Sequence, residues 1–238
     1  MKIAILGYGK MGKVIEQIAE SRGHSIVLTI DEDNAASLKT EDLKQADVAI
    51  EFSVPASAVN NIYKCFEANV PVVVGTTGWL DKLEEVKSNC TEKKQSLFYS
   101  SNYSIGVNLF FKLNEYLAKL MNGHREYNPE IEEIHHVHKL DAPSGTALSI
   151  AEQILNQLEA KQKWVNTSTD NPNELGIISK RIGEVPGTHT VTYRSEADEI
   201  SITHFAHNRK GFATGAVIAA EWLIGKKGVY GMNDLLKD

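Results

Sequence analysis

The sequence predicts an α/β protein in two parts, a parallel sheet flanked by helices followed by an α+β region with a mixed sheet. Strand-like and helix-like segments alternate through residues 1–102, which is the pattern of a parallel, doubly wound sheet. After residue 102, strand-like runs follow one another with few helices between them, which predicts substantial antiparallel pairing. With 238 residues, 42% of them hydrophobic, the chain has enough apolar material for both cores.

Charge and cysteine content narrow the class of protein. The formal net charge is −6, without long blocks of one sign, so no electrostatic footprint for nucleic acid is visible. The apolar run at the N-terminus is too short for a signal sequence or a membrane span. Cys65 and Cys90 lack paired-motif spacing and are expected to be free thiols of a reducing compartment. We therefore expect a cytoplasmic enzyme without nucleic-acid or membrane partners.

A glycine motif follows the first apolar run, residues 2–6. Residues 7–12 read G-x-G-x-x-G, a helix pattern continues to Gly23, and a second apolar run ends at Asp31. This order is that of a Rossmann dinucleotide site, in which glycines admit the pyrophosphate at a helix N-terminus and the acid binds the adenosine ribose. A glycine-rich turn without a ligand is the less favoured interpretation. The predicted cofactor-binding residues are Gly7, Tyr8, Gly9, Lys10, Met11, Gly12 and Asp31.

Three further strands are predicted in the first part, at residues 48–53, 70–75 and 96–99, with helices at 55–68 and 81–93. Ligands of open α/β sheets bind at the carboxyl ends of the strands, where this chain carries small polar loops at Ser53, Gly75 and Ser100. Each loop could also be only a turn. We expect these loops to line the nicotinamide half of the cofactor through Gly75, Thr76, Thr77, Ser100, Ser101, Asn102 and Tyr103.

Charge near the ribose-binding acid favours NADH over NADPH. Asp31 repels a 2′-phosphate, and Glu32 places a second carboxylate where an arginine would hold that phosphate. Lys10 in the glycine loop is the one nearby cation that could tolerate NADPH, so the use of both cofactors stays open.

The second part begins with an amphipathic helix that starts near Ser104 and ends at Asn122-Gly123. Strands are predicted at 130–136, 177–183, 189–194 and 199–206, with one helix between the first two, and a polar surface loop at 166–174. The small-residue helix 212–224 is expected to pack back on the first domain. The predicted domains are residues 1–102 completed by 210–238, and residues 103–209 as a substrate domain.

Residues 132–147, EEIHHVHKLDAPSGTA, gather three histidines, a lysine and a Ser-Gly-Thr turn. On a strand, His135 shares a face with Glu133, whereas His136 points away. If the strand ran on to Lys139, the Cα atoms of His135 and Lys139 would lie about 13 Å apart, at roughly 3.3 Å per residue. Both side chains could not then act on one small substrate. We therefore predict that the strand ends near His136 and that residues 141–143 complete a turn.

A helix is predicted to start at Ser144-Gly145-Thr146, because residues 147–158 carry a continuous apolar stripe. The free N–H groups and the positive dipole end of such a helix suit a carboxylate, and histidine exchanges protons near neutral pH. The segment therefore predicts an anion site beside a proton donor.

Other interpretations of this segment are weaker. His135, His136 and His138 lie too close together in an extended chain for a good three-histidine zinc site, and no cysteine is near, so we predict no metal. Ser144 is expected to cap the helix whatever else it does. Lys139 alone would be an ordinary solvated lysine, but its place between the histidines and a helix N-terminus favours a functional role.

The segment HHxxKxDAPSGTA, together with the N-terminal glycine motif, resembles the dihydrodipicolinate reductase family. The resemblance runs essentially from end to end of the chain. Its other motifs are residues 7–12, 51–55, 75–78 and 102–104, Arg181-x-Gly183, Gly187-x-His189, residues 202–204 and Arg209-x-x-Phe212-Ala213.

The resemblance implies a 4-hydroxy-tetrahydrodipicolinate reductase of diaminopimelate and lysine biosynthesis. In this reaction NADH or NADPH reduces a cyclic, unsaturated dicarboxylate to tetrahydrodipicolinate, and a general acid protonates the enamine-type anion. The resemblance also implies a homotetramer, assembled through the sheet of the second domain. Carried over by position, the catalytic residues are His135 and Lys139, and the substrate-binding residues are His136, Ser144, Gly145 and Thr146.

Two features depart from many relatives. The glycine loop is shorter and Glu32 stands where a basic residue is common, which bears on the use of NADPH. The connection from Asp31 to Asp47 is also short, so a trimmed crossover helix is expected there.

Two rival functions are a different nicotinamide oxidoreductase, such as an imine or semialdehyde reductase, and a binding protein that senses NADH. Thiohemiacetal chemistry needs a nucleophilic cysteine, and neither Cys65 nor Cys90 lies in a suitable loop. A sensor would not need the lysine and histidine cluster, and no helix-turn-helix is evident.

Overall fold

A computed structural model describes residues 1–208 and 210–237 of the chain. The chain divides into two compact units: Met1–Ile105 with Lys210–Asp238 form the first unit, and Gly106–Arg209 form the second. Arg209, which belongs to one of the motifs above and ends the predicted second domain, and Asp238 lie outside the described residues.

The first unit is built on a six-stranded sheet in the order β2-β1-β3-β4-β5-β11, with every neighbouring pair parallel. Strand β1 is almost completely buried because helices cover both faces of the sheet, which explains its uninterrupted apolar sequence. The strands are β1 (Lys2–Leu6), β2 (Ser25–Ile30), β3 (Val48–Glu51), β4 (Val72–Val74), β5 (Ser96–Tyr99) and β11 (Gly228–Tyr230).

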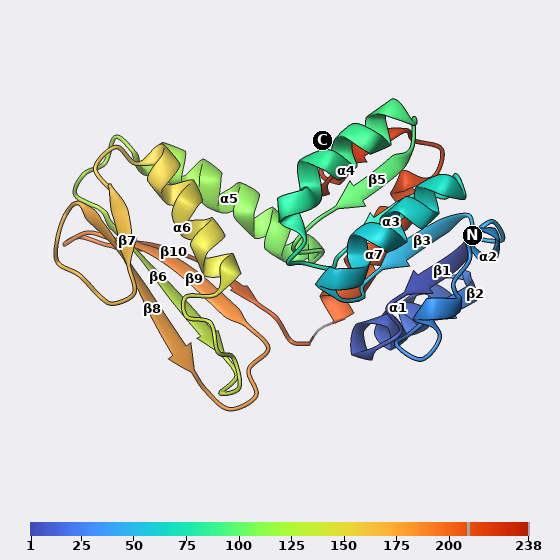
Figure 1. Ribbon diagram of the computed structural model, residues 1–238. Helices are drawn as coiled ribbons and strands as arrows, with labels where there is room; N and C mark the ends of the chain where they lie inside the picture. The colour runs from blue at the N-terminus through green and yellow to red at the C-terminus, as the bar shows by residue number, and fades with distance from the viewer. Residues whose placement is uncertain (209, 238) are drawn as a thin grey trace. The chain divides into compact units, whose positions relative to one another are not determined.

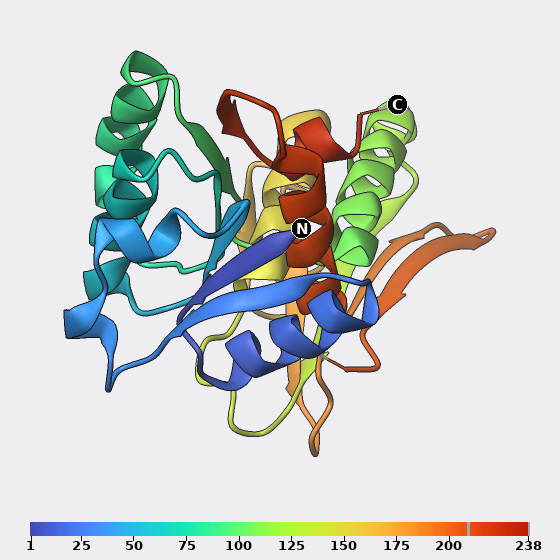
Figure 2. The same cartoon turned by 90° about the vertical axis from the view of Figure 1, so that its right-hand side faces the viewer.

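Two helix layers enclose this sheet, as Figure 2 shows. Helices α3 (Pro55–Glu67) and α4 (Leu83–Glu92) pack with the short segments 35–37 and 40–43 on one face. Helices α1 (Lys10–Ser21) and α7 (Lys210–Leu223) pack on the other face, with α8 (Met232–Leu235) beside them. The connection from β2 to β3 holds only a 3₁₀ turn (Ala35–Ser37) and the four-residue α2 (Thr40–Leu43), so the trimmed crossover is confirmed.

The order of the strands places a topological switch point at β1. From β1 the chain passes to β2 on one side, and the next strand, β3, lies on the other side of β1. Loops that leave β1 and β3 at their carboxyl ends therefore diverge, and such a crevice is the place where open α/β sheets bind ligands.

The second unit is a helix-covered mixed sheet in the order β10-β9-β6-β8-β7. Strand β8 runs parallel to β6 and β7, whereas β9 runs antiparallel to β6 and β10. Helices α5 and α6 cover one face of this sheet (Figure 1), and their apolar residues form one core with the strands. The elements are α5 (Ile105–Met121), β6 (Asn128–His135), α6 (Gly145–Gln157), β7 (Lys163–Val165), β8 (Glu174–Arg181), β9 (Thr188–Arg194) and β10 (Glu199–Phe205).

The predicted fold class is confirmed, and the differences from the sequence-based elements are small. Strands β7 and β11 were not predicted, because three residues are too few to show an alternating pattern. The helix predicted over 81–93 begins with a 3₁₀ turn (Leu80–Lys82), and β8 starts three residues earlier than predicted. No described helix is long and apolar enough to cross a membrane.

Replacement of Gly215 by alanine should destabilise the first unit. A Cβ atom at position 215 of α7 would lie 1.7 Å from the backbone oxygen of the buried Tyr103, so the helix would have to move. We expect Gly215→Ala to lower the free energy of unfolding by about 1–3 kcal/mol in chemical denaturation. Gly211→Ala in the same helix is the control, because its Cβ atom would meet only the Ser104 hydroxyl at an ordinary 3.5 Å. Equal stability of the two variants would contradict this packing.

Candidate active site

The first unit has a cavity of about 390 Å³ at the switch point between β1 and β3. The glycine loop after β1, the acidic turn after β2 and the loop after β3 form its walls. The cavity is lined by Gly7, Tyr8, Gly9, Ile30, Asp31, Glu32, Asp33, Ala35, Phe52, Ser53, Val54, Ser57 and Asn61. Four predicted cofactor residues, Gly7, Tyr8, Gly9 and Asp31, therefore lie together there.

The glycine loop has the geometry that a dinucleotide needs. Gly7 has φ +102°, and a Cβ atom there would lie 2.1 Å from the backbone oxygen of Phe52, so no other residue fits. A Cβ atom on Gly12 would lie 2.4 Å from the backbone oxygen of Gly7, which shows how closely α1 approaches the loop. By contrast, nothing lies within 4 Å of the Cβ position of Gly9. This open face is where a pyrophosphate can approach the backbone.

Asp31 presents one free carboxylate oxygen to the cavity. Its Oδ1 accepts hydrogen bonds from the backbone N–H groups of Asp33 and Asn34, at 3.0 and 3.2 Å. Its Oδ2 receives no hydrogen bond from the residues that the structure describes, so it can accept one from a ribose hydroxyl. The charged side chains that line this cavity, Asp31, Glu32 and Asp33, are all acidic.

The other predicted cofactor residues lie at the same edge of the sheet but outside this cavity. Lys10, Met11 and Gly12 form the first turn of α1, and residues 75–77 and 100–103 follow β4 and β5. The Tyr103 side chain is buried and donates from its hydroxyl to the backbone oxygen of Val74, at 2.7 Å. It therefore supports the loops from the core, and only its backbone can meet a ligand.

Sequence reasoning missed several residues that line the cavity from β3 and α3. Phe52 and Val54 lie in the Glu51–Pro55 motif, and Ser57 and Asn61 lie one turn apart on α3. The buried Glu51 holds this loop, because its carboxylate accepts hydrogen bonds from Ser53 and from the Asn61 amide. Burial raises the pKa of Glu51, and these hydrogen bonds offset only part of the rise. The sequence predicted that the loop at Ser53 faces the cofactor, but it did not predict the wall that the neighbouring residues form.

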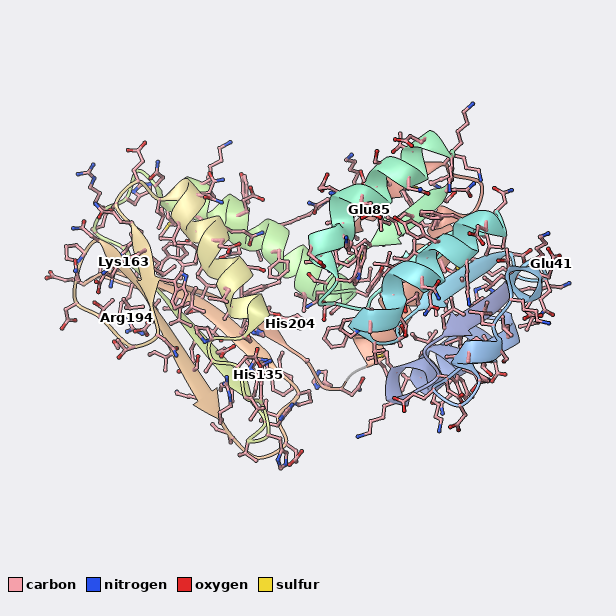
Figure 3. The ribbon with its side chains drawn as sticks, in the orientation of Figure 1. Glu41, Glu85, His135, Lys163, Arg194 and His204 are labelled. Carbon is pink, nitrogen blue, oxygen red and sulfur yellow. The ribbon has the colours of Figure 1, made fainter. Side chains whose placement is uncertain are left out.

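In the second unit, β6 ends at His135 and the chain turns immediately, so the predicted strand break is confirmed. The backbone N–H of Lys139 donates to the backbone oxygen of His136, at 3.2 Å, which closes the turn. Glu133 and His135 are buried on one face of β6, as the alternation predicted. Figure 3 labels His135, which lies on β6 near the first turn of α6.

The Glu133 carboxylate connects most of this site. It is 0% exposed, and both of its oxygens accept from the backbone N–H of Ser144, each at 3.1 Å. Arg181 Nη2 donates to Oε1 at 3.2 Å, and Nδ1 of His135 lies 3.4 Å from Oε2. Burial acts to raise the pKa of Glu133, but the hydrogen bonds from Ser144 and the nearby His135 ring hold it below its ordinary value. Glu133 is therefore a carboxylate at neutral pH.

Two buried imidazoles, His135 and His189, face each other with ring centroids 5.1 Å apart. Burial lowers the pKa of His135; the Glu133 charge opposes this, and Lys139 and Arg181 lower it further. For His189, burial and the His135 ring lower the pKa to about 4, so this ring is neutral at pH 7. Of the two rings, His135 lies closer to the Glu133 carboxylate, at 3.4 Å against 3.8 Å, and that charge favours its protonated form.

Arg181 fixes the loop that carries Lys139. Its Nε donates to the Lys139 backbone oxygen at 3.3 Å, and its Nη2 donates to the Asp141 backbone oxygen at 2.5 Å. The Lys139 ammonium pairs with the Asp141 carboxylate at 2.8 Å. That hydrogen bond lowers the pKa of Asp141. The loop is thereby held by its backbone, while the Lys139 charge stays close enough to act on His135.

The three residues at the start of α6 that were predicted to bind substrate, Ser144, Gly145 and Thr146, differ in their contacts. Ser144 is the N-cap, with its hydroxyl accepting from the Ala147 N–H at 3.2 Å and lying 3.2 Å from Nε2 of His189. The predicted cap is thus confirmed, and the hydroxyl is already engaged. Gly145 is exposed and Thr146 half-buried, and their backbone N–H groups have no acceptor among the described residues. These two N–H groups are free for an anion.

Distance alone would let Glu133, His135 and His189 surround a metal ion, since their ligand atoms lie within 4.8 Å of one another. However, the Arg181 guanidinium and the Ser144 N–H already occupy the carboxylate. A divalent ion there would face that fixed positive charge, so the arrangement suits an ion-pair network and we assign no metal. His138, from the weighed zinc triad, is exposed and lies 3.2 Å from Glu184 instead.

Sequence reasoning gave no role to Glu133, Arg181 or His189, which the structure brings around His135. Arg181 and His189 occurred in short motifs of the resemblance, and Glu133 shares the face of β6 with His135. The pairing of β6 with β8 and β9 places them together, and no local pattern reveals that pairing. His136, which was predicted to bind substrate, is half-buried, and its Nδ1 lacks a hydrogen-bond partner among the described residues.

Comparison with known proteins gives a family match for each of the two units. Residues 1–103 match the family described as dihydrodipicolinate reductase, N-terminus, and residues 106–236 match its C-terminus. The chain is 49% identical to 4-hydroxy-tetrahydrodipicolinate reductase of Christiangramia forsetii, over 100% of this chain and 98% of that one. It is 35% identical to the same enzyme of Neisseria meningitidis serogroup B, over 99% and 97%.

A solved structure shows the same fold. The dipicolinate-bound dihydrodipicolinate reductase of Paenisporosarcina sp. TG-14 superimposes with a TM-score of 0.79 at 24% identity, over 99% of both chains. The match therefore extends over the elements of both units. With two family matches that together span nearly its whole length, the chain belongs to the dihydrodipicolinate reductase family.

Proposed function

We propose that His135 and Lys139 supply the proton for the reaction of this family, the reduction of a cyclic, unsaturated dicarboxylate to tetrahydrodipicolinate. The observation that carries the proposal is the junction of β6 and α6. There, a buried imidazole, an ion-paired lysine and two free helix N–H groups come from one short segment. Proton donors and an anion cradle are the two things that this substrate requires.

Protonation follows from the electronic structure of the substrate. When bound, the reduced nicotinamide supplies a hydride. Addition of hydride to a C=C–C=N system leaves an enamine-type anion, which must gain a proton to become stable product. His135 and Lys139 are the groups of this cluster that can donate one, and the donor regains its proton from water. Overall the substrate gains one hydride and one proton.

The substrate carboxylates are matched by the first turn of α6. The backbone N–H groups of Gly145 and Thr146 are free, and the helix dipole adds positive potential at the same place. His136 and the Thr146 hydroxyl offer further hydrogen bonds, whereas the Ser144 hydroxyl is used by the helix cap. We therefore propose that Ser144 supports the cradle and that Gly145, Thr146 and His136 contact the ligand.

The cysteines weigh against a semialdehyde reductase. A thiohemiacetal needs a thiolate in the active site. Cys65 and Cys90 are both buried in the first unit, and burial raises the pKa of both thiols, to about 11 for Cys90. Two unpaired thiols also support a cytoplasmic location for a biosynthetic enzyme.

Loss of either proton donor should abolish turnover. The assay follows NAD(P)H consumption with the condensation product of aspartate semialdehyde and pyruvate made in situ. We expect His135→Ala and Lys139→Ala to lower kcat at least about a hundredfold, because general acids contribute on that scale. Binding of the reduced cofactor, followed by its fluorescence, should survive. The controls are the exposed His124→Ala and Lys163→Ala. Full turnover by both donor variants would overturn these roles.

We also propose NADH as the preferred cofactor. The carboxylates of Asp31, Glu32 and Asp33 lie at the ribose end of the cavity, where the 2′-phosphate of NADPH would be repelled. Lys10, the cation weighed in favour of NADPH, begins α1 and does not line this cavity.

Reversal of one charge should shift this preference. We expect a higher kcat/KM with NADH than with NADPH, and we expect Glu32→Arg to change the ratio by about tenfold towards NADPH, equivalent to about 1.4 kcal/mol. Kinetics with both cofactors measure the ratio. Glu84→Arg on α4 makes the same change of charge away from the cavity and should leave the ratio unaltered. An unchanged ratio in Glu32→Arg would contradict the electrostatic explanation.

Finally, we propose a homotetramer formed through the second unit's sheet. Among the described residues, helices α5 and α6 cover one face of this sheet, and the other face carries small polar pairs such as Thr190 with Thr203 and Thr192 with Ser201. Sedimentation equilibrium should give about four times 26.3 kDa. Thr192→Lys should reduce this mass, because like charges would face each other across the interface. A monomeric mass for the unaltered chain would contradict the proposal.

A further inference from the structure

The Glu133 carboxylate is the only group described above that touches both the proton-donating ring and the anion cradle. It lies 3.4 Å from Nδ1 of His135 and accepts from the N–H of Ser144, which precedes the free N–H groups of α6. Its charge is also paired with Arg181, which holds the backbone of the Lys139 loop. One buried side chain therefore contacts the His135 ring and the N-cap of α6, and it is linked to the Lys139 loop through Arg181, although it is itself 0% exposed and cannot reach the substrate.

The His135 ring has a defined inner and outer nitrogen. Nδ1 is buried and makes no hydrogen bond within the standard limits, and Glu133 Oε2, at 3.4 Å, lies just beyond them. The opposite edge of the ring faces Gly187, where a Cβ atom would come within 3.2 Å of Nε2. Because position 187 has no side chain, Nε2 is not blocked from that side, whereas Nδ1 faces the Glu133 carboxylate. Of the two ring nitrogens, Nε2 is therefore the one that can face a ligand.

We propose that Glu133 is a positioning residue for the protonation step: its carboxylate holds His135 with Nδ1–H inward, so that Nε2 is the atom that exchanges the proton. This inference rests on the proposed function. Nε2–H of the imidazolium breaks, its proton passes to the enamine-type anion, and the neutral ring keeps Nδ1–H towards Glu133. Water then returns a proton to Nε2, so the cycle is balanced.

The charges around His135 determine the direction in which loss of the Glu133 charge shifts the pKa of that ring. Glu133 on β6 and Asp141 in the loop favour the imidazolium, whereas Lys139 in the loop and Arg181 on β8 oppose it. From β9 the neighbour is His189, itself next to His204 of β10, and it is neutral at pH 7 because its pKa is about 4. Burial lowers the pKa of His135, and Glu133 is the strongest influence that raises it. Loss of the Glu133 charge must therefore lower the pKa of His135 further.

Glu133→Gln removes the charge and keeps the shape. The pKa and tautomer of His135 can be followed in the full-length protein by NMR of ¹³C-labelled histidine, with His135→Asn used for assignment. We expect the pKa of His135 to fall by about one unit and the Nδ1–H tautomer to lose its dominance. Because the acid form is needed, the high-pH limb of kcat should move down by about the same amount.

Glu132→Gln is the matched control. Glu132 precedes Glu133 on β6, points to the opposite face and pairs with Lys180 on β8 at 2.5 Å, just as Glu133 pairs with Arg181. Its pH profile should coincide with that of the unaltered protein. Glu133→Asp keeps the charge, so it should restore most of the pKa while lowering kcat through the shorter reach.

The results of these experiments distinguish failure of the proposed function from failure of the positioning role of Glu133. If the unaltered protein fails to turn over the dicarboxylate, the proposed function fails, and the NMR titration still tests the link between Glu133 and His135. If the protein is active but Glu133→Gln leaves either the pKa of His135 or the pH limb in place, the positioning role is wrong. A fall in thermal stability with an unmoved limb would mean that Glu133 only supports the fold, which also overturns the inference.

Discussion

The ion pair between Glu133 and Arg181 is the interaction on which the second unit's site depends. A carboxylate with 0% exposure loses its hydration, a cost of several kcal/mol that must be offset locally. Here the Arg181 guanidinium and the Ser144 N–H replace water at the same two oxygens. Each partner then performs a second task, since Arg181 holds the 139–141 loop and Ser144 caps α6. The geometry of strand, loop and helix is thus determined at one point.

In the first unit, the shape of the ligand site is determined by main chain and not by side chains. Its ligand site needs close approach, and Gly7 and Gly12 allow three segments of main chain to lie where no side chain would fit. Acidic groups line this cavity only through Asp31 and its two neighbours. The contrast explains why the two units carry different residue types. The first unit excludes side chains around its glycine loop, and the second concentrates charged side chains around His135.

Local patterns were enough to predict the fold class and the approximate positions of most elements. The glycine motif, the face shared by Glu133 and His135 and the cap at Ser144 are all encoded within a few residues of sequence. The break after His135 followed from the reach of an extended chain. Partners that arrive from other strands were not predicted, because Arg181 and His189 join the site only through the pairing of β6 with β8 and β9. The α3 wall of the cavity was not predicted for the same reason, and the three-residue strands β7 and β11 are too short to show a pattern of their own.

The return of α7 to the first unit has a consequence for synthesis on the ribosome. Ala213, Ala216 and Ala220 fill the core between α7 and the sheet, so residues 1–105 alone leave the part of that sheet face beside α1 uncovered. The second unit is continuous in sequence and leaves the ribosome before α7 does. Domains generally fold as units as they leave the ribosome, so the second unit can be complete while the first still waits for its last helix. During that interval the exposed face is a site for chaperone binding or misassociation.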